Sequence, residues 1–190
     1  MRKQLALLMI LAANLVNAQN PVTASVGISR ALFGSGDLRG LDYFNELKMP
    51  LGDHIGLLPS IHIAYGSNQT YASTEPRFTT AALGLDFFAY YSPMKTTKSK
   101  VMLFTGASLR HFNVANPKSF GNTPNPNFGL PNLYYFDYET QKQNTIGYGF
   151  GLEGEAVLKK WSFGGRGYFS TYLNGQSIAA LGLKIGREIN

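Results

Sequence analysis

The chain has 190 residues, a net charge of +6 and no cysteine, and only 15% of its residues are charged. That length corresponds to one domain, and the lack of cysteine excludes a disulfide scaffold and thiolate metal sites. Lys and Arg are scattered along the chain instead of clustered, so we expect no nucleic-acid partner. The 21 glycines, 13 phenylalanines and 11 tyrosines are typical of aromatic-rich strands relieved by glycine, and not of helices.

Residues 1–18 have the pattern of a cleaved signal peptide. Arg2 and Lys3 precede an apolar run from Leu5 to Val16, and the segment ends in small residues at Ala18. A transmembrane helix is the competing interpretation, but this run is shorter than the roughly 20 residues that span a bilayer. We therefore expect a mature domain of residues 19–190. Nothing after residue 18 is long and apolar enough for a spanning helix, so any membrane insertion must use strands.

Eight segments alternate between apolar and small or polar residues, with the period of two that predicts β-strands. Their lengths suit tilted strands crossing the hydrocarbon layer, where an open sheet edge would leave backbone groups without a hydrogen bond. In the fifth segment Met102 and Phe104 are apolar at positions of the otherwise small and polar face, so the sequence does not decide which of its faces points to lipid. We predict an all-β fold, an eight-stranded antiparallel up-and-down transmembrane β-barrel, with strands near 22–32, 41–49, 54–66, 80–91, 103–110, 145–158, 161–170 and 179–186.

Charged residues share the face that carries the small residues. They are five acids and four bases: Asp42, Glu46, Lys48, Asp86, Arg110, Glu153, Glu155, Arg166 and Lys184. A water-soluble barrel would keep apolar side chains inside, so we expect the apolar face to point outward, to lipid. Buried charges are tolerated when they are paired, and eight strands leave a lumen that side chains can fill. The sequence therefore predicts a lumen plugged by ion pairs.

Aromatic residues fall near both ends of the predicted strands, as in the girdles of membrane interfaces. One row is Tyr90, Tyr91, Trp161 and Phe163, and the other is Tyr65, Phe112, Phe169 and Tyr172.

Residues 113–144 contain four prolines and are too long for an ordinary connection, so we interpret them as a functional loop. Long connections of such barrels face outward and short turns face the periplasm. The apolar residues of this loop could bind a protein partner or pack over the barrel mouth. They are Phe128, Leu130, Tyr134, Tyr135, Phe136 and Tyr138.

The signal peptide, the strand Ile146–Leu158 and the last strand Leu181–Gly186 resemble those of the OmpA/OmpX-like outer-membrane β-barrel family. The resemblance spans the mature chain. Members commonly finish on an aromatic residue, whereas this chain ends at Ile189 and Asn190. The resemblance implies an exported monomer in the outer membrane of a Gram-negative cell envelope, in contact with membrane lipid and lipopolysaccharide.

No catalytic, cofactor or metal site is predicted. The segment Gly149–Gly154 fits a dinucleotide-binding glycine pattern, but the alternation continues where a helix would have to begin. His54, His62 and His111 lack metal-ligand spacing, and His62 is interpreted as a hydrogen-bonded lumen residue. His111 and Ser67 are predicted at the same outer end, as in barrels that modify lipids, but no acid is placed to orient the histidine.

We therefore expect a non-enzymatic, porin-like barrel that presents extracellular loops for structural, adhesive or docking roles. Two alternatives remain open at this stage. One is a lipid-modifying outer-membrane enzyme of the deacylase or acyltransferase kind. The other, if the two faces are inverted, is a soluble periplasmic barrel that holds an apolar ligand.

Overall fold

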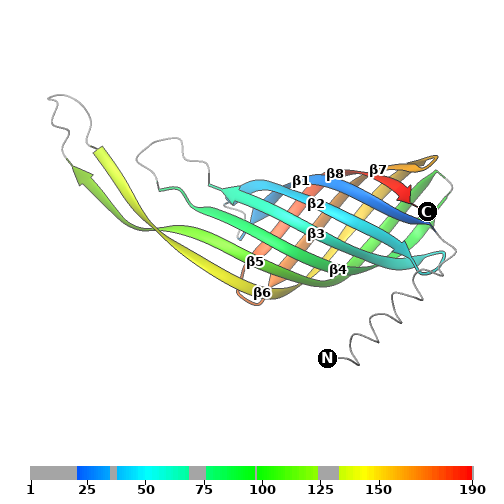
Figure 1. The fold of residues 1–190 in the computed structure, drawn as a ribbon, viewed down its shortest axis with the longest axis horizontal. Helices are drawn as coiled ribbons and strands as arrows, with labels where there is room; N and C mark the ends of the chain where they lie inside the picture. Colours follow the sequence, from blue (N-terminus) through cyan, green and yellow to red (C-terminus); the bar gives the residue numbers. More distant parts are fainter. Residues whose placement is uncertain (1–20, 35–37, 69–75, 97, 124–132, 190) are drawn as a thin grey trace.

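A computed structural model describes residues 21–34, 38–68, 76–96, 98–123 and 133–189, which form an eight-stranded antiparallel barrel (Figure 1). Each strand pairs with its neighbours in sequence, and β1 pairs with β8 to close the cylinder. The predicted fold class is confirmed. The strands are β1 (Val22–Phe33), β2 (Leu38–Pro50), β3 (Ile55–Ser67), β4 (Thr79–Lys95), β5 (Ser99–Thr123), β6 (Leu133–Leu158), β7 (Trp161–Tyr172) and β8 (Ser177–Ile189).

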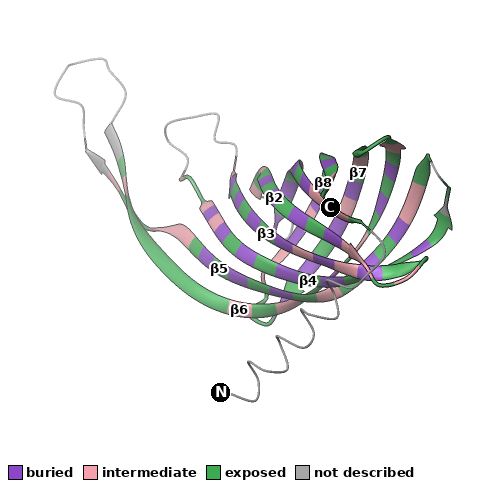
Figure 2. Ribbon diagram, turned by 45° about the vertical axis from the view of Figure 1, so that its right-hand side comes forward, coloured by how far each residue is buried: buried purple, intermediate pink, exposed green. Residues whose placement is uncertain are grey.

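Burial alternates residue by residue along the barrel strands (Figure 2). In β3, for example, Ile63 is 57% exposed whereas its neighbour Ala64 is 2% exposed. The exposed positions are mostly aliphatic or aromatic, and the nine charged residues predicted for the lumen are buried, whereas Arg30, Arg39 and Arg187 are exposed near strand ends. The apolar face therefore points outward, as predicted from the alternation. Among the described residues, no helix is long and apolar enough to span a membrane.

The interior is more aromatic than the sequence suggested. Phe44, Phe88 and Phe112 are each at most 1% exposed and point inward with the charged residues. Met102 and Phe104 are buried too, which settles the facing of β5: Leu103 and Leu109 are on the outer face. Apolar rings and charges thus share one packed lumen.

Residues 113–123 belong to β5 and residues 133–144 to β6, so the interpretation of residues 113–144 as a loop is wrong for these two parts. β5 and β6 pair from Ser99 with Ala156 to Thr123 with Leu133, with one register shift between Pro117 and Ser119. This register shift is a β-bulge, and an irregular position of this kind tolerates Pro117, which has no backbone N–H to donate. The two strands project beyond the barrel as one hairpin (Figure 1).

Two smaller expectations also need correction. Residues 92–100 contain Pro93 and three lysines, from which the sequence predicts one solvated turn. They are not one turn, since β4 continues to Lys95 through a register shift and β5 begins at Ser99. Three residues assigned to the aromatic girdles, Tyr90, Phe112 and Tyr172, are buried in the lumen. The other five are exposed on the outer face: Tyr65, Tyr91, Trp161, Phe163 and Phe169. The predicted signal peptide, residues 1–18, lies outside the described residues.

Gly182 and Gly154 form a matched pair for testing the inward-facing packing. A Cβ atom on Gly182 would lie 2.2 Å from the carbonyl oxygen of Ile28 and 2.5 Å from Cα of Ser29, whereas one on Gly154 would meet nothing within 4 Å. We predict that Gly182→Ala lowers the free energy of unfolding by about 1–3 kcal/mol, the usual effect of overpacking. Gly154→Ala should change it by less than about 0.5 kcal/mol. Urea unfolding of the barrel refolded in detergent measures both, and equal effects would contradict the packing described here.

Candidate functional site

The structure places all nine charged residues of the predicted lumen network inside the barrel, each at most 5% exposed. They come from six strands: β2, β4, β5, β6, β7 and β8. Strand alternation puts them there, because they occupy the positions between the lipid-facing apolar residues. Their contacts divide them into two clusters.

The first cluster links strands that are not neighbours through Glu46 and Lys184. Glu46 of β2 forms ion pairs with Arg166 of β7 and with Lys184 of β8, whose Nζ lies 2.8 Å from Oε1 of Glu46. Lys184 also lies 2.6 Å from Oε1 of Glu153 and 3.3 Å from Oε1 of Glu155. Glu155 in turn pairs with Lys48 of β2. These contacts join β2, β6, β7 and β8 across the lumen.

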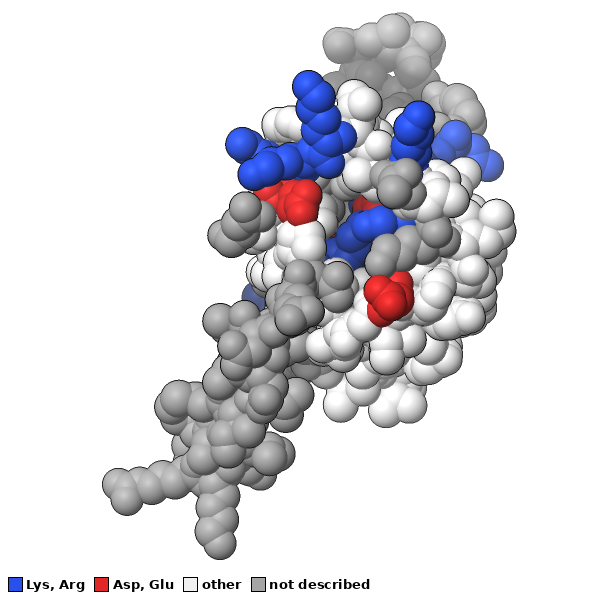
Figure 3. Space-filling model, turned by 90° about the vertical axis from the view of Figure 1, so that its right-hand side faces the viewer, with Lys and Arg blue, Asp and Glu red and all other residues white. Residues whose placement is uncertain are grey.

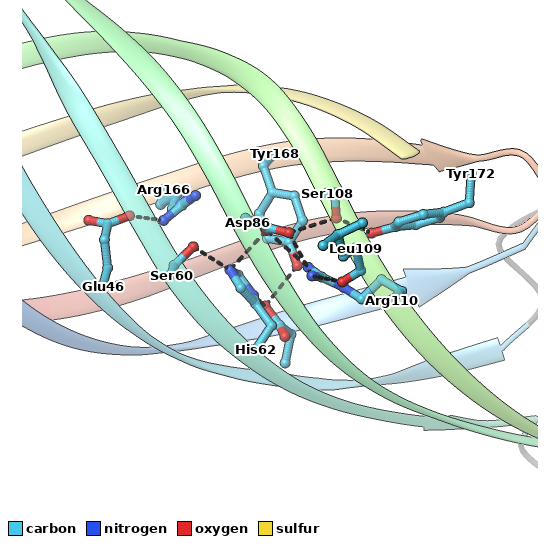
Figure 4. A network of polar contacts seen from close by, with 11 residues as sticks. Glu46, Ser60, His62, Asp86, Ser108, Leu109, Arg110, Arg166, Tyr168 and Tyr172 are labelled. Carbon is cyan, nitrogen blue, oxygen red and sulfur yellow. Dashed lines mark hydrogen bonds and ion pairs between the residues drawn. The ribbon is translucent and has the colours of Figure 1, made fainter. Parts of the chain in front are cut away.

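The second cluster surrounds Asp86 (Figure 4). The Arg110 guanidinium donates to both oxygens of Asp86, at 2.6 and 3.0 Å, and the Ser108 hydroxyl donates to Oδ1 at 2.6 Å. His62 lies between Asp86 and Asp42, and the Tyr168 hydroxyl donates to Asp42 at 2.7 Å. A bidentate arginine–carboxylate pair is a strong and directional contact, so it holds β4 and β5 in register.

Aromatic rings surround the Arg166 guanidinium. Its central carbon lies 4.3 Å from the ring centroid of Phe104 and 5.0 Å from that of Phe44. Phe88 and Tyr168 lie farther away, at 5.9 and 5.5 Å. A desolvated cation over ring faces gains about 2 kcal/mol from the ring quadrupoles. The interior phenylalanines thus support the same charge that Glu46 neutralises.

At the end of the barrel where β1 begins and β8 ends, the interior opens into a cavity of about 210 Å³. Lys48, Tyr90, Lys100 and Met102 are among the residues that line it, and Lys48 also lines a neighbouring cavity of about 70 Å³ with Glu155. Figure 3 looks onto this end and shows Lys and Arg side chains around and inside a hollow. The Lys48–Glu155 ion pair therefore borders the mouth of the lumen.

The hairpin of β5 and β6 is the second candidate site. Beyond Ala115, which pairs with Thr79 of β4, the described residues of β5 pair with β6 alone. On β6, Gly147 is the last residue that pairs with β7, through Tyr172, and from there to Leu133 the strand pairs with β5 alone. The hairpin thus presents two open backbone edges.

Exposed aromatic residues lie on this hairpin. Tyr135 is 56% exposed and Tyr138 46%, while Phe136 is half-buried beside Phe120, which is 69% exposed. The Tyr138 hydroxyl accepts a hydrogen bond from the backbone of Arg77, which ties the hairpin to the segment before β4. Of the other predicted loop residues, Phe128 and Leu130 lie outside the described residues, and of Tyr134 only the backbone pairing with Asn122 is described.

His111 and Ser67 do not form a catalytic pair. They lie on β5 and β3, which β4 separates, and Nδ1 of His111 lies 2.7 Å from the side-chain oxygen of Asn144. No ion pair joins His111 to a carboxylate within the part of the chain that the structure describes. The Gly149–Gly154 segment lies within β6, so no helix follows it. In the described ranges, no group of three His, Asp or Glu residues could hold a metal ion.

Sequence reasoning missed the extent of the hairpin and the partners of His62. The hairpin was recognisable from the run Tyr134–Tyr138, since tyrosine and phenylalanine favour strands, but the prolines outweighed that signal. The partners of His62 were not recognisable, because they depend on the register between the strands.

A scan against protein-family models and a search of curated protein sequences find no match. A search of solved structures finds Ail, the attachment invasion locus protein of Yersinia pestis, with a TM-score of 0.54, 11% identity and coverage of 90% of this chain and 100% of that one. Neisserial surface protein A is similar with a TM-score of 0.58, 14% identity and coverage of 88% and 97%. A major outer membrane protein from Thermus thermophilus is similar with a TM-score of 0.57 and 11% identity, and the match covers 90% of this chain and 100% of that one. The chain therefore has the fold of small bacterial outer-membrane β-barrels.

Removing the Glu46 charge tests the first cluster. We predict that Glu46→Gln lowers the free energy of unfolding by about 3–5 kcal/mol, because the buried cations Arg166 and Lys184 would both lose the carboxylate that they share. Glu139→Gln on the exposed hairpin is the matched control and should change it by less than about 0.5 kcal/mol. Chemical unfolding in detergent measures both values. A Glu46→Gln barrel as stable as the control would show that the cluster contributes no net stability.

Proposed function

We propose that this chain is a non-enzymatic protein of the Gram-negative outer membrane, closed along its axis, that presents the β5–β6 hairpin outside the cell for structural, adhesive or docking roles. The observation that carries the proposal is the sorting of side chains. Nine charged residues lie buried within the barrel, and a largely apolar surface surrounds it, as in proteins whose solvent is lipid. A soluble barrel that holds an apolar ligand would need the opposite arrangement.

A sealed lumen follows from what fills it. Ion pairs cross the interior between strands that do not pair with one another, and phenylalanine rings occupy the space around them. An eight-stranded barrel is only about wide enough for its own side chains, so we propose that it conducts no steady stream of ions. The chain would then act through its surface and not as a pore.

The hairpin supports a docking role in two ways. Its strands have open edges, and an extended peptide can add to such an edge through main-chain hydrogen bonds. Tyr135 and Tyr138 are exposed beside those edges, and tyrosine is enriched where proteins bind one another. A protein partner that contributes one strand would use both features. Within the membrane every strand is paired, so the barrel itself needs no second copy and we propose a monomer there.

The lack of cysteine allows a direct test of insertion and orientation, since any introduced thiol is unique. Lys118 lies on the projecting hairpin, and Lys160 lies in the turn between β6 and β7 at the opposite end; both are exposed. We predict that a membrane-impermeant maleimide labels Lys118→Cys in intact cells but labels Lys160→Cys only after the outer membrane is permeabilised. Equal labelling of both before permeabilisation, or recovery of the folded chain in the soluble fraction, would contradict the proposal.

A further inference from the structure

Each ring nitrogen of His62 faces a carboxylate. Nδ1 lies 2.9 Å from Oδ2 of Asp42, and Nε2 lies 3.1 Å from Oδ2 of Asp86. The side chain is completely buried and stacks on Phe44 with 5.4 Å between ring centroids. It meets the edge of Tyr168, also drawn in Figure 4, at 5.7 Å. The ring is therefore held in one orientation between acids from β2 and β4.

With Asp42 and Asp86 both ionised, this geometry favours two protons on the ring. A neutral imidazole has one N–H and one bare nitrogen, and a bare nitrogen against a carboxylate oxygen would bring two lone pairs into contact. Asp86 acts as an acceptor throughout, since it receives two N–H groups from Arg110 and the Ser108 hydroxyl. The Ser60 hydroxyl oxygen also lies 3.1 Å from Nε2 and is the one neighbour that could donate to a bare nitrogen there. Even so, that nitrogen would still face the Asp86 oxygen.

The charge balance of the interior leads to the same conclusion. Asp42, Glu46, Asp86, Glu153 and Glu155 are opposed by four Lys and Arg residues, which leaves one negative charge in excess. Within the described residues Asp42 has no ion pair with Lys or Arg; its contacts are His62 and the Tyr168 hydroxyl. An unpaired carboxylate buried at this depth is strongly unfavourable. One further cation, placed against Asp42, would neutralise the interior.

We propose that His62 is an imidazolium and the fifth cation of the interior charge network, a positioning residue that bridges Asp42 of β2 to Asp86 of β4. The groups that face it are Asp42 from β2, Ser60 from its own strand, Asp86 from β4 and Tyr168 from β7, and Arg110 of β5 lies behind Asp86. The inference rests on the proposed sealed lumen, because open access to water would solvate Asp42 without a partner. His62 links the second cluster across three adjacent strands, as Lys184 links the first.

Nitrogen NMR of the wild-type chain, labelled with ¹⁵N-histidine and folded in lipid nanodiscs at neutral pH, tests this inference directly. The chain has three histidines, and a His62→Gln sample identifies the signals of His62 by their loss. We expect both ring nitrogens of His62 to show the shift and the one-bond proton coupling of an N–H group. One His62 nitrogen with the shift of a bare ring nitrogen would overturn the proposal.

Stability measurements provide a second test with an internal rescue. His62→Gln leaves Asp42 buried without a cation, so we expect the equilibrium constant for unfolding to rise by about a hundredfold or more. Adding Asp42→Asn removes the unpaired charge. We expect the unfolding constant of the double variant to be at least about tenfold lower than that of His62→Gln alone. His111→Gln is the matched control, since His111 is exposed and contacts the neutral Asn144.

Additive losses in the double variant would overturn the proposal, because they would show that His62 and Asp42 do not compensate each other's charge. These outcomes are separate from those of the proposed function. A barrel that inserts and is labelled as predicted, yet carries a bare nitrogen at His62, would refute the imidazolium alone. A chain that does not enter the membrane would refute the function, whatever the state of His62.

Discussion

Pairing of charge inside a closed cylinder is the constraint on which the rest of this structure depends. In lipid, every backbone group must find its hydrogen bond within the chain, and closing β1 onto β8 meets that need. Closure leaves a narrow interior in which five carboxylates lie together. Glu46 of β2 contacts both Arg166 of β7 and Lys184 of β8, so strands that do not pair with one another are joined by ionic contacts as well as by the backbone ladder. Without those cations the same interior would repel itself.

The aromatic side chains of the lumen extend this arrangement. Phe44 stacks on His62 and also lies beneath the guanidinium of Arg166, so one ring contacts both clusters. Phe104 faces Arg166 from β5 and stacks on Phe88 of β4 with 5.3 Å between centroids. In the proposed sealed lumen, the phenylalanines would take the space between ion pairs that water could otherwise occupy. Exclusion of water strengthens the charge pairs, and the charge pairs hold the rings in place.

Much of this architecture was predictable from the residues, and the reason is the period of two. A strand that alternates Ile146, Tyr148 and Phe150 with glycines has only one face for lipid, so the facing of nearly every strand followed. Prediction failed where periodicity competes with another signal. Prolines concealed the outer halves of β5 and β6. Tyr90 and Phe112 were assigned to the interfacial girdles because they lie near strand ends, although the alternation along their strands places them on the inner face.

The contacts of the candidate site were less predictable than its membership. Parity assigns Asp42, His62 and Asp86 to the lumen, but it does not say that they come from three adjacent strands at one height. That follows from the register, which pairs Asp42 with Ala64 and Ser60 with Asp86. A shift of two residues along one strand would keep every side chain on its face and change every ion pair. The partners within the lumen therefore required the structure.

Tryptophan placed in turn at two neighbouring phenylalanine positions tests most directly which side chains face lipid and which face the lumen. Trp161 is the single tryptophan of the chain, so Trp161→Phe provides a silent background. Phe150, 52% exposed, and Phe104, 3% exposed, lie at the same height on paired strands, because Phe104 pairs with Gly151. In vesicles of brominated lipid, tryptophan fluorescence should be strongly quenched in Phe150→Trp and little affected in Phe104→Trp. Equal quenching at both positions, or stronger quenching at position 104, would contradict an apolar exterior around a charged interior.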